Sequence, residues 1–239
     1  MTQREKNKNS TDISPRNAAL IGGILLLAIS ILAPIGHYGT IQNLIVPEDA
    51  AATVSKISAS QGLFRIGIIC LLINAILDLV VAWALYIVLK PVNKSLSLLS
   101  AWFRVVYTAI LVVALSNFVN VLQLLDGASY LAAFEPSQVQ AQVMFLIDSY
   151  DNVWTLGYVI FGLHLISLGY LLFKSDYFPA FLGILVGIAG FGYLIDHLGI
   201  ILFSSYSLEI SIYTFVGEAL LLIWLLIRGF KGFKQELQD

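Results

Sequence analysis

The segment Leu63–Leu89 reads LFRIGIICLLINAILDLVVAWALYIVL, and it decides the fold of this chain. Arg65 and Asp78 are the charged residues in it, and about 20 consecutive apolar residues are enough for a helix to cross a bilayer. Five other stretches have the same character. We predict helical spans at about residues 17–35, 63–89, 98–125, 143–173, 181–203 and 210–227. The expected fold class is therefore all-α, a polytopic membrane protein with a six-span transmembrane helix bundle.

The composition agrees with this prediction. Of 239 residues, 59% are hydrophobic and 12% are charged, and the mean hydropathy is +0.87, whereas about a quarter of a soluble domain is charged. We expect a polar tail over residues 1–15, a membrane domain over 16–228 and a second tail over 229–239. The net charge of -2 and the scattered basic residues do not suggest nucleic acid as a partner. The expected partner is the lipid bilayer.

The start of the chain resembles a secretory signal peptide, because a basic leader precedes the apolar run Ala18–Ala33. Cleavage before Pro34 would need a small residue where Ile31 stands, and the leader is long. We therefore predict a retained anchor, although Ala28–Ser30 is a weaker alternative cleavage signal.

The distribution of lysine and arginine predicts the orientation. The basic residues that six spans would place on one side are Arg4, Lys6, Lys8, Arg16, Lys90, Lys94, Lys174, Arg228, Lys231 and Lys234. The other side would carry Lys56 and Arg65 together with several acidic residues. Positive residues are enriched in short cytoplasmic loops, so both termini are expected in the cytoplasm and the protein in the cell membrane.

Four ionisable residues lie deep inside the predicted spans: Asp78, Arg104, His164 and Glu218. At 1.5 Å per residue, each is about 15–18 Å from the nearest cytoplasmic charge, and each belongs to a different helix. Asn74 lies one turn from Asp78 on the same face. A charge at the bilayer centre costs about 2.5–3.5 kcal/mol or more, so these residues need an explanation.

Two explanations remain open for this inner set. In the structural one, Asp78 and Arg104 form an ion pair between two helices, and His164 and Glu218 make hydrogen bonds between others. In the functional one, the set is a polar site reached by water, in which Glu218 or Asp78 exchanges protons or binds a cation.

A second, outer polar set is predicted near the opposite surface. It comprises Arg65, Asp148, Asp151, Asp196 and His197. We favour interfacial groups in contact with water. Asp148 and Asp151 are three residues apart and share a helix face. Asp196 and His197 are adjacent and point about 100° apart on a helix, so they do not form a local pair.

Glycines and aromatic residues are predicted to serve packing. Gly183 and Gly187, with the glycines of the span 143–173, would allow two helices to approach closely inside the bundle. The aromatic residues, including Tyr107 and Trp154, are assigned to packing or to the membrane interface, without a binding role. Two loop segments also carry helix-start signals, at 46–52 and at Glu135–Ser137.

Several stretches together resemble a known family. They are IVPEDAA at 45–51, LFRIG at 63–67, LYIVLKPVN at 85–93, ASYL at 128–131, GLHLISLGY at 162–170, YLID at 193–196 and VGE at 216–218. With these segments the chain resembles a bacterial membrane family catalogued as domain of unknown function 4386. The resemblance implies a multi-spanning membrane protein, and no activity, substrate or site residue comes with it.

Three functions are consistent with the sequence: a small-solute or proton-linked carrier, a membrane-embedded enzyme, and a non-catalytic membrane or interaction protein. The sequence contains no His-Glu-x-x-His, Gly-x-Ser-x-Gly or Cys-x-x-Cys motif. Asp78, His164 and Glu218 are suitable metal ligands by type, but we predict no metal site and no cofactor. The single cysteine, Cys70, is expected to be a small apolar packing residue.

Overall fold

The computed structural model of the protein describes residues 13–127 and 133–232, and these residues form helices and no strands. The helices are α2 (Pro15–Pro34), the π-helical η1 (Ile35–Gln42), α3 (Ala50–Ala59), α4 (Gln61–Leu89), α5 (Lys94–Leu125), α6 (Pro136–Phe173), α7 (Ala180–Leu202), α8 (Ile210–Thr214) and α9 (Val216–Lys231). The all-α prediction is confirmed. Arg4, Lys6, Lys8, Lys234, the ASYL stretch and most of both predicted tails lie outside the described residues.

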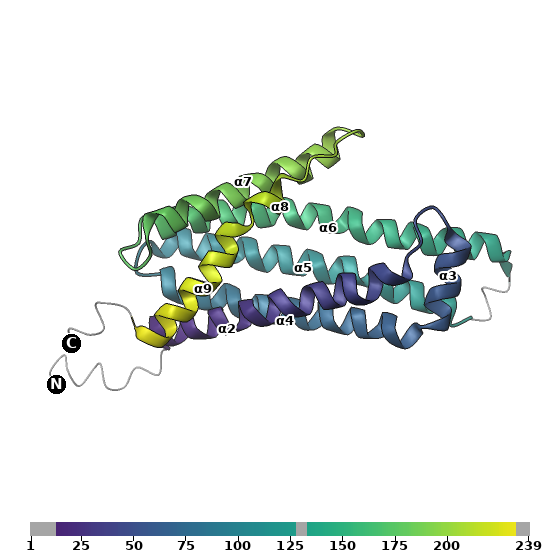
Figure 1. Cartoon of the computed structure of the whole chain (residues 1–239), viewed down its shortest axis with the longest axis horizontal. Helices are drawn as coiled ribbons and strands as arrows, with labels where there is room; N and C mark the ends of the chain where they lie inside the picture. Colours follow the sequence, from purple (N-terminus) through teal and green to yellow (C-terminus); the bar gives the residue numbers. More distant parts are fainter. Residues whose placement is uncertain (1–12, 128–132, 233–239) are drawn as a thin grey trace.

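The long helices form a closed ring. Each packs on the next one along the chain, from α2 through α4, α5, α6 and α7, and α9 closes the ring by contacting both α7 and α2. Six helical segments are long and apolar enough to cross a membrane. Both ends of the described chain lie at the same end of the bundle (Figure 1), as an even number of spans requires.

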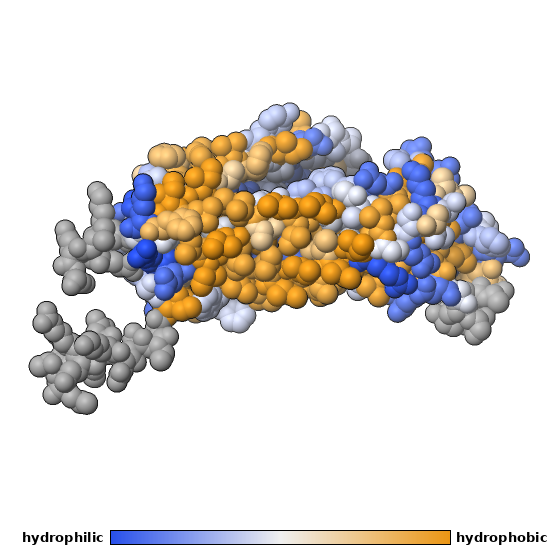
Figure 2. All heavy atoms as spheres, turned by 60° about the horizontal axis from the view of Figure 1, so that its bottom comes forward, coloured by the Kyte–Doolittle hydropathy of each residue, from blue (hydrophilic) through white to orange (hydrophobic). Residues whose placement is uncertain are grey.

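The surface matches a membrane environment. Figure 2 shows a broad apolar belt around the middle of the bundle and hydrophilic residues at both ends. Large apolar side chains such as Ile76 and Phe191 are more than half exposed within that belt. Because exposed apolar patches of this size are costly in water, the belt is the surface that faces lipid.

The helices begin at residues with suitable capping chemistry. The Asp49 and Asn93 side chains accept hydrogen bonds from the backbone N–H groups of the first turns of α3 and α5. Glu135 and Gln138 form a capping box at the start of α6. The start signal at Glu135–Ser137 thus begins the fourth long helix itself, because neither proline nor glycine interrupts the chain before residue 143. At 38 residues, α6 is about 57 Å long and extends beyond the bilayer core.

The first helix does not end near Pro34, as the sequence suggested. It continues as the π-helical segment η1 to Gln42, although Pro34 has no backbone N–H to donate within the helix. Gly67 of α4 makes the close contact with η1 possible, since a Cβ there would lie 2.7 Å from Cγ1 of Ile41.

Glycines bring α6 and α7 into backbone contact at the end of the bundle that holds the termini. A Cβ on Gly169 would lie 2.6 Å from the carbonyl oxygen of Gly183, and a Cβ on Gly162 would lie 2.8 Å from that of Gly190. This is the close internal packing that the glycine pattern predicted. Further along, the two helices diverge, and the far end of α7 stands away from the bundle (Figure 1).

Candidate functional site

Three of the predicted inner residues are in direct contact. The Arg104 guanidinium of α5 donates two hydrogen bonds to one carboxylate oxygen of Asp78 on α4, one of them from Nε at 3.0 Å. Its third nitrogen lies 3.2 Å from Nε2 of His164 on α6. All three residues are at most 5% exposed. We call Asp78, Arg104 and His164 the buried triad, and it links three consecutive helices.

The hydrogen bonds define the state of His164. A guanidinium nitrogen can only donate, so Nε2 of His164 must be the acceptor and carry no proton. The proton is then on Nδ1, which donates to the backbone carbonyl of Ser100 at 2.9 Å. The Ser100 hydroxyl lies 3.1 Å from the same nitrogen. The imidazole is therefore neutral, and both of its nitrogens are occupied.

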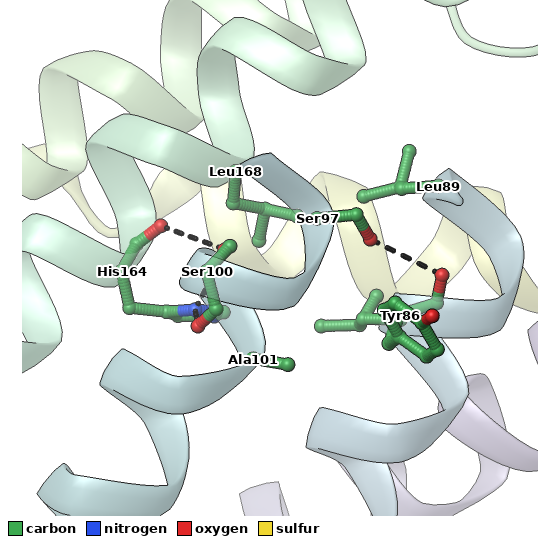
Figure 3. Close-up of a pocket in the computed structure, with 8 residues that line it drawn as sticks. Tyr86, Leu89, Ser97, Ser100, Ala101, His164 and Leu168 are labelled. Carbon is green, nitrogen blue, oxygen red and sulfur yellow. Dashed lines mark hydrogen bonds between the residues drawn. The ribbon is translucent and has the colours of Figure 1, made fainter. Parts of the chain in front are cut away.

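The surroundings of His164 are closed. Figure 3 shows His164 facing Ser100, beside Ser97, whose hydroxyl donates to the carbonyl of Tyr86 at 3.1 Å. The space between these side chains has no volume that a water molecule could occupy. Within the described bundle the buried triad is thus a compact, internally paired unit with no room for a substrate beside His164.

Glu218 is placed differently from the triad. It lies in the first turn of α9, and among the described residues its buried Oε1 atom has no hydrogen-bond partner. The Tyr193 side chain of α7 hydrogen-bonds to the Glu218 side chain. Arg104 and Asp78 are near enough to Glu218 for electrostatic interaction. The structure therefore brings Glu218 next to the triad without including it in the triad's hydrogen bonds.

Asn74 lies one helical turn from Asp78 on α4 and is buried, at 6% exposed. Its Oδ1 atom makes no hydrogen bond to any described residue. Asn74 shares the α4 face of Asp78, as its spacing predicted, but it does not join the triad's hydrogen bonds.

The outer polar set separates into different roles. Arg65 pairs with Asp126 at 3.3 Å, and both side chains are about half exposed. Asp148 and Asp151 are exposed on α6. These three residues lie at the surface, as expected for interfacial groups.

Asp196 departs from that expectation, because it is 3% exposed. Its carboxylate accepts hydrogen bonds from the Tyr206 hydroxyl at 2.7 Å and from the backbone N–H groups of Ile210 and Ser211 at 3.0 and 2.7 Å. Desolvation and the bond to Asp196 raise the pKa of Tyr206 to about 12, so the phenol stays a donor. Asp196 therefore anchors the start of α8. Its partners are 10 to 15 residues away in the sequence, so these contacts could not be predicted from local spacing.

His197 points away from its neighbour and stacks on Tyr158, with ring centroids 4.5 Å apart. It is one member of a continuous aromatic group, of which the sequence analysis assigned Tyr107 and Trp154 to packing or the membrane interface and placed His197 in the outer polar set. The group, which we call the aromatic wedge, comprises Tyr107, Trp154, Tyr158, Phe161, Tyr193 and His197. The spacing offered a signal, since Trp154 and Tyr158, and likewise Tyr193 and His197, are four residues apart and share helix faces.

The fold and these features define the class of the protein. It is a multi-pass, all-helical protein of membrane type, with paired charges buried in the centre of its bundle. A family model described as "Domain of unknown function (DUF4386)" matches residues 21–229. The chain belongs to this family, as the resemblance of its sequence segments indicated.

A relative supports the assignment without adding an activity. An "Uncharacterized protein" from Archaeoglobus fulgidus is 40% identical over 156 residues, which cover 65% of this chain and 79% of that protein. That relative is archaeal, so a bacterial origin for this chain stays a prediction. No solved structure matches the chain. Function must therefore be argued from the geometry.

Proposed function

We propose that the protein is a proton-linked carrier of a small solute, and that Glu218 is the group that exchanges a proton or contacts the solute. The observation that carries this proposal is the unpartnered Oε1 of Glu218, deep within the sixth span. Tyr193 contacts the Glu218 side chain, but a buried carboxylate oxygen that makes no hydrogen bond still lowers stability. Its presence is best explained by a ligand or a proton that interacts with it during the protein's work.

The form of the sixth span also supports a carrier. This span has a one-residue break in its helix at Phe215, between the five-residue α8 and α9, and Glu218 lies three residues after it. Interrupted helices with polar groups at the break, near the middle of the membrane, are a recurring feature of solute-binding sites in secondary transporters.

The buried triad favours a different role for the other inner residues. Asp78 and Arg104 neutralise each other, and His164 has no free nitrogen. We assign the triad to stability and helix register. This arrangement would also suit a non-catalytic membrane protein, and it is why that alternative is retained. No observation favours an embedded enzyme.

The proposed setting is the cell membrane, with both termini in the cytoplasm. The support is the charge of the described helix ends: Arg16, Lys90, Lys94, Lys174, Arg228 and Lys231 lie at the end that holds the termini. Short cytoplasmic segments carry such an excess. Reporter fusions after residues 92 and 176 should then report cytoplasm, and a fusion after residue 127 should report the opposite side.

Proton movement into proteoliposomes tests the carrier proposal. Vesicles containing the protein and a trapped pH dye are exposed to gradients of cationic, anionic and neutral small solutes. At least one solute should drive a pH change that is lost in Glu218→Gln. Asp126→Asn is the matched control, because that carboxylate is about half exposed and far from the triad. The proposal fails if no solute moves protons, or if Glu218→Gln behaves as the parent protein does.

A further inference from the structure

The aromatic wedge is a continuous surface supplied by three helices. Tyr107 of α5 packs against Trp154 and Phe161 of α6, with centroids 4.8 and 4.6 Å apart. Trp154 continues to Tyr158 at 4.7 Å. Tyr158 stacks on His197 at 4.5 Å and on Tyr193 at 5.4 Å. These rings lie between α5, α6 and α7.

The wedge has a buried back and a partly exposed front. Tyr107 and Phe161 are 7% and 6% exposed, whereas Trp154, Tyr158, Tyr193 and His197 are only partly buried. In the space-filling view, paler and more hydrophilic residues interrupt the apolar belt on one face of the bundle (Figure 2). The front of the wedge is only partly covered by the rest of the chain.

The charge around these rings is negative. Glu218 interacts with Tyr193 and is electrostatically coupled to Tyr158. The exposed Asp151 of α6 interacts electrostatically with Tyr158 as well. Arg104 lies 5.6 Å from the Phe161 ring, but its charge is balanced by Asp78. The rings thus lie between an inner and an outer carboxylate.

Aromatic packing alone does not explain this combination. Buried polar atoms in folded proteins are nearly all hydrogen-bonded, and each exception calls for an explanation. Here Oε1 of Glu218 and Nδ1 of His197 both lack a hydrogen-bond partner among the described residues. His197 belongs to the wedge, and Glu218 contacts Tyr193 of the wedge.

We propose that the aromatic wedge and Glu218 form a binding site for a small organic cation, of the quaternary ammonium or protonated amine class. The faces of tyrosine and tryptophan rings attract such cations, and the Glu218 carboxylate supplies the countercharge. This inference rests on the proposed function, since it names the substrate class of the same site. A cation bound here would take the place of the proton on Glu218, which is how proton and solute movement would be linked.

Calorimetry on the purified full-length protein in detergent tests the inference. The probes are tetramethylammonium, tetraethylammonium and choline, and the matched neutral probe is 3,3-dimethyl-1-butanol, which has the shape of choline without its charge. At least one cation should bind with a dissociation constant of about 1 mM or tighter, and the neutral alcohol should not. The inference is overturned if no cation binds, or if the alcohol binds as well as choline.

Variants locate the site. Glu218→Gln should weaken cation binding at least tenfold, and Tyr158→Leu should weaken it about 2- to 30-fold, the equivalent of one cation–π contact. Tyr158→Phe keeps the ring and should keep most of the affinity. Trp102→Phe is the control, because Trp102 is 59% exposed on the lipid-facing surface of α5. Equal affinity in all four variants would place the cation elsewhere and overturn the inference.

The two proposals can fail separately. Solute-driven proton movement that depends on Glu218, without cation binding, would keep the carrier and reject this substrate class. Cation binding that depends on Glu218, without any proton movement, would keep the site and reject the carrier.

Discussion

Removing one partner of the buried triad should destabilise the protein strongly. In Asp78→Asn, the Arg104 guanidinium loses the carboxylate to which it donates two hydrogen bonds, and it remains buried at 5% exposure. The cost of leaving one partner of a buried ion pair uncompensated is about 3–5 kcal/mol. Arg104→Gln should cost a similar amount, because it leaves the Asp78 carboxylate buried and also removes the donor to His164.

The double variant Asp78→Leu/Arg104→Met separates pairing from packing. Replacing a buried ion pair by apolar residues of similar volume is often neutral or stabilising. We therefore expect the double variant to lie within about 1 kcal/mol of the parent protein. With the single variants Asp78→Leu and Arg104→Met each expected to cost about 3–5 kcal/mol, the coupling energy of this cycle should be about 5 kcal/mol or larger, well beyond its error.

The assay is reversible unfolding in mixed micelles, followed by far-UV circular dichroism. The chain supplies its own control in the Arg65–Asp126 pair, whose side chains are 47% and 53% exposed. Exposed ion pairs contribute about 0–1 kcal/mol, so the same substitutions there should change stability little. If the Asp78 and Arg104 single variants cost no more than these controls, the structural role of the triad is refuted.

Three further predictions concern other parts of the fold. Asp196→Ala should lower the unfolding free energy by about 2–4 kcal/mol and should speed hydrogen exchange in residues 203–214. Unchanged exchange there would contradict the anchoring role. Gly169→Ala should cost about 1–3 kcal/mol, because its Cβ would meet the α7 backbone at 2.6 Å. Gly187→Ala, where the described structure leaves 4 Å of open space, should be neutral or slightly stabilising in the same thermal melt; equal losses would argue against glycine-mediated contact. Arg16→Ala removes hydrogen bonds of 3.1 and 2.9 Å to the last carbonyls of α9. It should lower the unfolding free energy by about 0.5–2 kcal/mol and speed hydrogen exchange at that end of α9. Faster exchange only in other segments would reject a capping role for Arg16.

The fold was predictable because the membrane imposes a simple rule on the sequence. Apolar length identifies the spans, and the rise per residue puts buried charges at comparable depths. That calculation placed Asp78, Arg104 and His164 at one level, and the structure shows them in contact. Depth does not give the rotation of each helix, so it could not distinguish these residues from Glu218, which lies at the same level outside the hydrogen-bonded group.

The remaining features depend on contacts that no local pattern specifies. Asp196 accepts hydrogen bonds from a segment up to 15 residues later, and its burial follows from the fold of that loop. The aromatic wedge combines residues of α5, α6 and α7, whose alignment depends on the angle at which α7 leaves α6. The four-residue spacings of Trp154 and Tyr158, and of Tyr193 and His197, indicated that each pair shares one face of its helix. They did not indicate that the two faces pack against each other.

The stability of Glu218→Gln tests the central claim most directly, which is that Glu218 is kept for a ligand or proton while the triad is kept for the fold. Its unfolding free energy should equal or exceed that of the parent protein in the mixed-micelle titration, because the buried Oε1 atom makes no hydrogen bond among the described residues and a neutral amide is cheaper to bury. A loss of about 3 kcal/mol or more, comparable with Asp78→Asn, would show that Glu218 is part of the structural network and would contradict the account.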